Sequence, residues 1–151
     1  METTLSVMAI VISMLSCVFA LYTFFWTVRR DRKQATLDAY NQLQDQAFDK
    51  LNLYSPAAIR KIAEEPKSEE YKIISGYIAR IEHFCVGVNQ NIYDRKRVYA
   101  LAHGYLDGNM LQSRIEPIIE KKHINATEDY YENIHTIIQW MKQEESKSKG
   151  K

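Results

Sequence analysis

The chain has 151 residues and a mass of 17.7 kDa, with 46% hydrophobic and 26% charged residues, which is enough for one folded domain and excludes a wholly disordered chain. Its five glycines and three prolines are too few for a turn-rich β-sandwich or a low-complexity protein. Two cysteines exclude a disulfide-framed miniprotein, and a formal net charge of +1 gives no reason to expect nucleic acid as a partner.

The first predicted element is an apolar helix over residues 5–28, a run that contains no charged residue, glycine or proline. As a helix it would be about 36 Å long, which is enough to cross a hydrocarbon core of about 30 Å. A signal peptide would have a basic start and a shorter apolar run, whereas residues 1–4 contain only the acidic Glu2. We therefore expect a retained transmembrane helix preceded by a short extracytoplasmic tail, residues 1–4.

The residues at the end of this run predict its orientation. Basic flanks stay on the cytoplasmic side of a membrane helix, and aromatic rings favour the headgroup level. This rule places the N-terminus outside the cell, residues 29–151 in the cytoplasm and the protein in the inner (plasma) membrane. The expected interface anchors, which would contact membrane lipid, are Tyr22, Trp26, Arg29, Arg30, Arg32 and Lys33.

Small residues form one stripe along the apolar run, at alternating spacings of three and four. Such a stripe lets membrane helices approach closely, and the heptad spacing suits a left-handed crossing. The alternatives are that these residues are merely tolerated, or that they line a narrow pore, although no charged ring supports a pore. We expect a helix–helix seam, in a homo-oligomer or with another membrane protein. The seam residues are Ser6, Ala9, Ser13, Ser16, Ala20, Thr23 and Thr27.

Helical periods recur after the apolar run, and no strand-like alternation stands out. Residues 29–54 read as a juxtamembrane helix that continues the membrane helix as one rod, because nothing interrupts the chain before Ser55. Ser55 can cap a short helix that has Pro56 in its first position, and Ser68 can cap a long one. The long helix is the expected core element. Its predicted apolar face is Ile74, Tyr77, Ile78, Ile81, Phe84, Cys85 and Val88.

Further helices are expected beyond this core helix. Asp94 can cap the first of them, and Pro117 can kink the next, which runs over residues 110–123. A turn at residues 107–109 separates these two helices, and Thr127 can cap the last one.

The predicted fold class is therefore all-α. A single N-terminal transmembrane helix continues into a small cytoplasmic helical bundle over residues 55–145, and a disordered tail follows at residues 146–151.

The search for catalytic motifs gives little. Phosphate loops, GxSxG, CxxC and HExxH are absent from the sequence. A Glu-x-x-His pair occurs twice, as Glu120 with His123 and as Glu132 with His135, a spacing that di-iron bundles use. The two pairs lie only 12 residues apart and the core face is apolar, so we expect surface histidines, no metal, no cofactor and no catalytic activity. A metal-dependent enzyme and a pore-forming effector are the alternative hypotheses.

One short run is strongly basic, Arg95-Lys96-Arg97 after Asp94. It can be read as a nucleic-acid patch, but a capping aspartate followed by a solvated first turn is the simpler interpretation. Since the basic residues are spread through the chain and nearly balanced by acids, we expect no nucleic-acid partner.

The order of these features resembles a widespread family of short bacterial and phage proteins, classed as a membrane-anchored domain of unknown function. In that family a long helix bearing a glutamate ends in a turn with Gly and Asn before an Ile-Tyr-Asp/Glu start. The matching residues are Glu82, Gly87, Asn91, Ile92, Tyr93 and Asp94. The resemblance implies a bacterial or prophage setting, sometimes near phage-conflict genes, and supplies no catalytic residues. We therefore expect a protein that acts by association, with a cytosolic protein partner, in a setting such as phage defence or superinfection exclusion.

Overall fold

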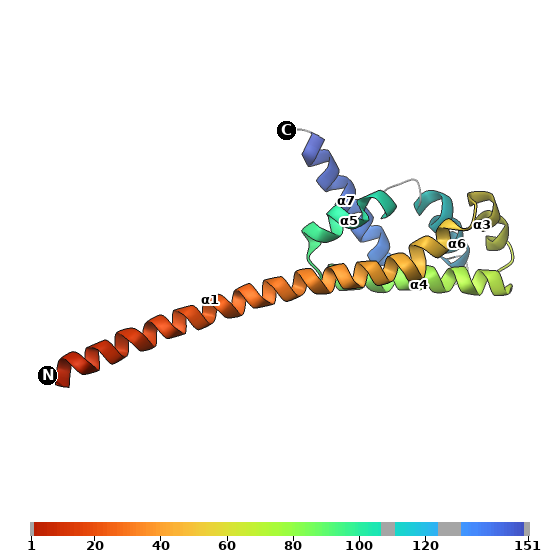
Figure 1. Ribbon diagram of the computed structural model, residues 1–151. Coiled ribbons are helices and arrows are strands. Elements are labelled where there is room, and N and C mark those ends of the chain that lie inside the picture. Colours follow the sequence, from red (N-terminus) through yellow and green to blue (C-terminus); the bar gives the residue numbers. More distant parts are fainter. Residues whose placement is uncertain (1, 107–110, 124–130, 150–151) are drawn as a thin grey trace.

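The computed structural model describes residues 2–106, 111–123 and 131–149, and Figure 1 shows them as helices joined by short connections. No strand occurs among these residues, so the all-α fold class is confirmed. Two expected features, the turn at residues 107–109 and the Thr127 cap, lie outside the described residues.

The N-terminal third of the chain forms one continuous helical rod. Helix α1 (Glu2–Leu43) passes into the π-helical turn η1 (Gln44–Phe48) and then into α2 (Asp49–Asn52). The chain has neither glycine nor proline over this stretch, so the helix continues without a break, although η1 replaces one α-helical turn by a wider π-helical one. In Figure 1 most of α1 extends away from the other helices, and its last turns, where buried residues begin at Thr36, pack on them. The expected continuation of the apolar helix into a second helical segment is confirmed.

The remaining helices build a small bundle beside the C-terminal turns of α1. They are α3 (Pro56–Ala63), α4 (Glu69–Asn89), α5 (Arg95–Leu106), the π-helical turn η2 (Leu111–Ile115), α6 (Glu116–His123) and α7 (Glu132–Lys149).

Three of the predicted caps are present in the bundle. Ser55 Oγ accepts a hydrogen bond from Ala58 N at 3.2 Å. Ser68 Oγ accepts one from Tyr71 N at 3.1 Å. In the same way, Asp94 Oδ1 accepts one from the backbone N of Arg97 at 3.0 Å. Each bond satisfies a backbone donor that the first turn of a helix leaves free, so these helices begin where the sequence predicts.

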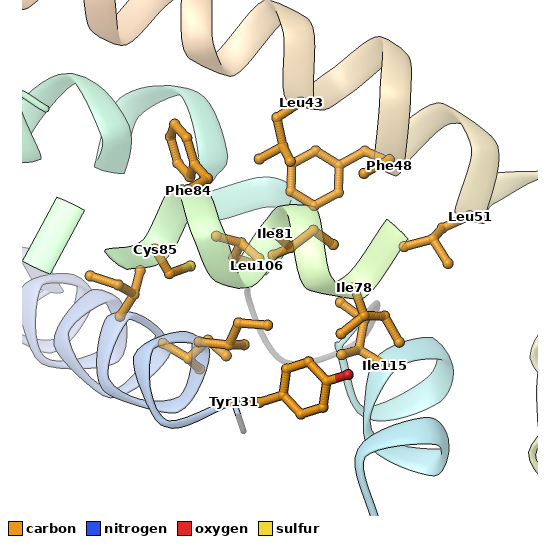
Figure 2. Close-up of a cluster of buried hydrophobic side chains, with 14 of the residues drawn as sticks. Leu43, Phe48, Leu51, Ile78, Ile81, Phe84, Cys85, Leu106, Ile115 and Tyr131 are labelled. Carbon is orange, nitrogen blue, oxygen red and sulfur yellow. The ribbon is translucent and has the colours of Figure 1, made fainter. Parts of the chain in front are cut away.

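Helix α4 is the central element of the core, as its periodicity predicts, and it packs against α1, η1, α2, α3 and α7. The predicted apolar face is buried except Tyr77, which is partly buried. Figure 2 shows Leu43, Phe48 and Leu51 approaching α4 from one side and Tyr131 approaching from the other. Each fully buried large side chain of this kind stabilises the fold by roughly 1.5–3 kcal/mol relative to its exposed state.

Two segments differ in detail from expectation. Pro117 lies at the second position of α6, and the expected kink takes the form of the π-helical turn η2 directly before it. A proline removes a backbone donor, which the chain accommodates by opening the preceding turn. The tail expected to be disordered from residue 146 is helical up to Lys149, which corrects that boundary. Local pairing supports this extension, since Lys147 Nζ lies 2.7 Å from Glu144 Oε1 one turn earlier.

Candidate functional site

The apolar half of α1 has no contact with the bundle. Exposure of its large hydrophobic side chains runs from 48% at Val28 to 68% at Phe19. Among the described residues this is the one helix long and apolar enough to cross a membrane, and its most hydrophobic window, with a mean hydropathy of 2.3, is 0% buried. The core helix of a soluble domain is buried on at least one face, whereas the apolar stretch of α1 is exposed on all faces. An apolar surface of this length is typical of a membrane or protein contact.

All seven seam residues lie on this exposed stretch, where two hydroxyls bond to the helix itself. Ser16 Oγ donates to the carbonyl of Ile12 at 2.9 Å, and Thr23 Oγ1 donates to the carbonyl of Phe19 at 2.9 Å. These bonds satisfy the hydroxyls without water, so the stripe is compatible with an apolar environment. The seam itself stays a prediction, because only contact with a second helix would demonstrate it.

The predicted interface anchors are also exposed, and they surround the end of the apolar stretch. The Arg30 guanidinium lies over the Trp26 ring at 5.5 Å and its Nε lies 3.5 Å from an Asp31 carboxylate oxygen. Arg32 differs from its neighbours because its Nε donates to the carbonyl of Ile92 at 3.4 Å. One predicted anchor therefore connects α1 to a turn that lies 60 residues further along the chain.

Residues 90–94, which we call the α4–α5 turn, are fastened to α1 through a buried threonine. The Thr36 side chain is fully buried. Its hydroxyl donates to the carbonyl of Arg32 at 2.7 Å and accepts from the backbone N of Asp94 at 2.8 Å. A buried hydroxyl is costly unless it is bonded, so this pairing specifies one position of the turn on α1. Nothing in the local sequence around Thr36 indicates this role.

The conformation of the α4–α5 turn accounts for several residues of the family pattern. Asn91 has a φ of 57°, the left-handed conformation that asparagine adopts more readily than most residues. The backbone N atoms of Ile92 and Tyr93 both donate to the carbonyl of Gly87, at 2.9 and 3.3 Å. The Tyr93 ring then stacks on Phe84 with centroids 5.1 Å apart. The turn is therefore held closely against the end of α4.

Gly87 is required by this close approach. A Cβ atom at position 87 would lie 2.9 Å from Tyr93 Cδ2 and closer still to Cε2, whereas at Gly76 on the same helix it would meet nothing within 4 Å. We expect Gly87→Ala to lower the free energy of unfolding by about 1–3 kcal/mol, since the ring must move. The matched control Gly76→Ala should raise it by up to about 1 kcal/mol, because alanine favours a helix. Urea unfolding of the detergent-solubilised chain, followed by circular dichroism, measures both, and equal stabilities would contradict the packing at Gly87.

Glu82, the glutamate of the family pattern, holds the start of α7. One carboxylate oxygen accepts from Asn133 Nδ2 at 2.7 Å and from its backbone N at 3.2 Å, and the other accepts from Ile134 N at 2.9 Å. Asn89 Nδ2 donates to Asn133 Oδ1 at 2.7 Å in turn. A carboxylate at the N-terminus of a helix satisfies free backbone donors and opposes the positive end of the helix dipole. Glu82 thus acts as an N-cap supplied by a different helix.

Two ionisable groups of the core, Cys85 and Tyr40, stay neutral because they are buried. Burial raises the pKa of the Cys85 thiol, and the neighbouring Glu82 carboxylate raises it further. Cys85 therefore stays protonated and serves as a small apolar side chain. Burial, with smaller effects of Tyr105 and Asp49, raises the pKa of Tyr40 to about 12, so this hydroxyl stays neutral near pH 7.

An open groove lies between α1 and α4 and has a volume of about 310 Å³. Its polar side chains include Gln42, Gln46, Arg80 and His83, and Arg80 Nη1 donates to the carbonyl of Gln46 at 3.1 Å. Its apolar wall includes Phe84. The volume is at the lower end of the range for small-molecule sites, and its polar groups are suited to hydrogen bonding.

The two Glu-x-x-His pairs lie on different helices. Glu120 is exposed on α6, and the side chain of His123 lies outside the described residues. Glu132 is exposed and His135 is half-buried on α7. Within the described part of the chain no three metal-ligating side chains come together, so the Glu132–His135 pair gains no further ligand there.

The fold and these contacts define a class of protein, in which a long exposed apolar helix is continuous with a small α-helical bundle. The chain matches the family described as a domain of unknown function (DUF4760) over residues 10–146, and it belongs to that family. The match includes most of the apolar stretch as well as the bundle, so the family's domain unites the two. No curated protein and no solved structure was found to match the chain.

Proposed function

We propose that this chain is a single-pass membrane protein that acts by association and has no catalytic activity. The observation that carries the proposal is the exposed apolar half of α1, where side chains such as Phe19 and Leu15 are more than 60% exposed. A bilayer removes this surface from water and also accommodates a helix whose backbone groups are all bonded internally. Residues 5–28 would cross the inner membrane, with Tyr22 and Trp26 at the interface.

The orientation in the proposal follows from the flanking charges. Residues 29–33 contain four basic residues and one acidic one, whereas residues 1–4 contain no basic side chain. The positive-inside rule therefore places the bundle in the cytoplasm. There it can bind a cytosolic protein, and the sequence favours neither a nucleic acid nor a cofactor as its partner. A bacterial or prophage setting, such as phage defence or superinfection exclusion, is consistent with this arrangement.

Association within the membrane would use the stripe of small residues. The stripe lies on one face of an exposed helix, and its hydroxyls at Ser16 and Thr23 are already bonded to the backbone. Small side chains on that face allow a second helix to pack closely, either from another copy or from another membrane protein. The proposal takes the homo-oligomer as its first case.

Enlarging the seam should weaken this association. We expect the double variant Ser13→Leu, Ser16→Leu to reduce the crosslinked oligomer in membranes about fivefold, because bulky side chains keep the helices apart. Crosslinking of membrane preparations, followed by denaturing electrophoresis, measures the oligomer fraction.

A matched control places the same side chains on the opposite face of the helix. The variant Val11→Leu, Val18→Leu should crosslink as the unaltered chain does, since these positions lie about half a turn from the stripe. Unchanged crosslinking in the Ser13→Leu, Ser16→Leu variant would contradict the seam.

A further inference from the structure

We propose that the α4–α5 turn is a second membrane contact, at which Ile92 and the basic first turn of α5 rest on anionic lipid headgroups. The inference rests on the proposed function, because it requires residues 5–28 to cross a bilayer. It adds that the bundle lies against the membrane surface in a defined orientation instead of hanging freely from its helix.

The position of the turn along α1 is the first argument. Arg32 lies four residues after Val28, which is about 6 Å along the helix axis. The headgroup layer on each side of a bilayer is about 5–7 Å thick. Since Arg32 bonds to the carbonyl of Ile92 and Thr36 bonds to Asp94 N, the turn is fixed close to headgroup depth. In Figure 1 the start of α5 lies at the end of the bundle that faces the apolar half of α1.

The exposed isoleucine is the second argument. Ile92 is 56% exposed, although its neighbour Tyr93 packs inward on Phe84. Its backbone N donates to the carbonyl of Gly87, so a rigid turn presents the side chain. Single exposed apolar residues are common on protein surfaces. Ile92, however, is held by a rigid turn at about the depth of the lipid headgroups. There the bilayer interface stabilises an apolar side chain.

The charge of the surrounding surface is the third argument. Helix α5 packs against α1, and the bonds from Asp94 N to Thr36 and from Arg32 to Ile92 bring its basic first turn near the basic residues that follow the apolar stretch. Residues 29–33 and 94–97 together contain seven basic residues and two acidic ones, Asp31 and Asp94, whereas the rest of the chain has more acidic than basic residues. Two basic runs that are separate in the sequence thus lie together at one end of the folded bundle.

The basic residues of α5 are placed differently from one another. Arg95 lies over the Trp140 ring at 5.8 Å and its Nε donates to the carbonyl of Val88 at 3.4 Å, which holds this side chain in place. Lys96 is exposed to solvent. The cytoplasmic leaflet of a bacterial or other plasma membrane carries anionic lipids, which attract such a surface within about 10 Å. The occupant that complements both the charge and Ile92 is therefore an anionic lipid surface.

Fluorescence quenching in lipid nanodiscs tests the contact on the full chain. A fluorophore is attached at Gln90→Cys, an exposed position in the turn that leaves Ile92 intact, and the background carries Cys17→Ser. Buried Cys85 remains, and the chain without an added cysteine measures its labelling. The matched control is Leu53→Cys, 80% exposed at the far end of the rod, roughly 35 Å from Val28. A third label at Met14→Cys reports insertion.

Lipids that carry a nitroxide on the headgroup should quench the label at position 90 and leave the label at position 53 nearly unchanged. Ile92→Asp, Lys96→Glu, or replacement of phosphatidylglycerol by phosphatidylcholine should each reduce the quenching at position 90. A change of one unit of charge near an anionic surface alters the ratio of docked to undocked bundle about fivefold, and Lys96→Glu, which changes the charge by two units, should alter it by more.

The three labels separate the possible failures. If acyl-chain nitroxides do not quench the label at position 14, the membrane anchor is wrong and this inference falls with it. If position 14 is quenched but position 90 behaves as position 53 does, the anchor stands and the second contact is wrong. The contact with anionic lipid would also be overturned if quenching at position 90 did not change with either substitution or with the lipid charge.

Discussion

Replacing Leu15 and Val18 by arginine should release the chain from membranes. Both side chains lie in the middle of the apolar stretch and are 64% and 65% exposed. An arginine at the centre of a membrane helix costs about 2.5–3.5 kcal/mol on insertion scales, so two of them cost about 5–7 kcal/mol. The fraction of the chain that stays with the membrane pellet after alkaline carbonate extraction measures the effect, and we expect it to fall from nearly all to a minor part.

The control for this result keeps the positions apolar. Leu15→Ile with Val18→Leu should extract as the unaltered chain does, which excludes an effect of substitution as such. Protease added to spheroplasts then reports the orientation, since the bundle should be digested only after the membrane is opened. Extraction of the unaltered chain by carbonate, or digestion of its bundle from outside, would contradict the proposed anchor and its orientation.

The second large effect is expected at Glu82. Glu82→Ala should lower the free energy of unfolding by about 3 kcal/mol. It removes the acceptor for two backbone N–H groups and one side-chain amide at the start of α7. These donors lie partly buried at the junction of α4 and α7, where leaving a donor without a partner costs free energy. Urea unfolding of the detergent-solubilised chain measures the loss, and Glu82→Gln, which keeps an acceptor oxygen, should lose less.

Glu132 provides the matched control, because it is an exposed glutamate in the first turn of α7. Its interaction with the helix dipole is worth less than about 1 kcal/mol at an exposed position. Glu132→Ala should therefore change the free energy of unfolding far less than Glu82→Ala does. If the two substitutions cost the same, the cap from α4 would not be what holds α7 in place.

These contacts give the C-terminal half of α4 polar connections besides its apolar packing. At one point Glu82 and Asn89 hold the start of α7. At its C-terminal end, the turn held by Gly87 is bonded to Thr36 of α1. The bundle is therefore oriented relative to the apolar helix by directional hydrogen bonds, whereas apolar packing alone specifies direction less strictly.

Features that depend on neighbouring residues could be read from the amino-acid order. The uncharged run at residues 5–28 predicts a long apolar helix, and the caps at Ser55, Ser68 and Asp94 are each made with a residue three positions later. The buried face of α4 follows from the period of 3.6 residues per turn. In each case the energies involve a single helix and its ends, so no knowledge of the rest of the fold is needed.

Features that join distant residues emerged only when the helices packed. Thr36 meets Asp94 across 58 positions, and Glu82 meets Ile134 across 52. Neither Thr36 nor Glu82 has a local sequence signature, because many threonines and glutamates on helices face water. The same holds for the basic residues of 29–33 and 94–97, which are separate in the sequence and are brought together where the α4–α5 turn bonds to α1. The local sequence thus specifies which helices form and which of their faces are apolar. Packing in three dimensions decides which polar side chains are buried and paired, because these contacts form only when segments far apart in the sequence come together.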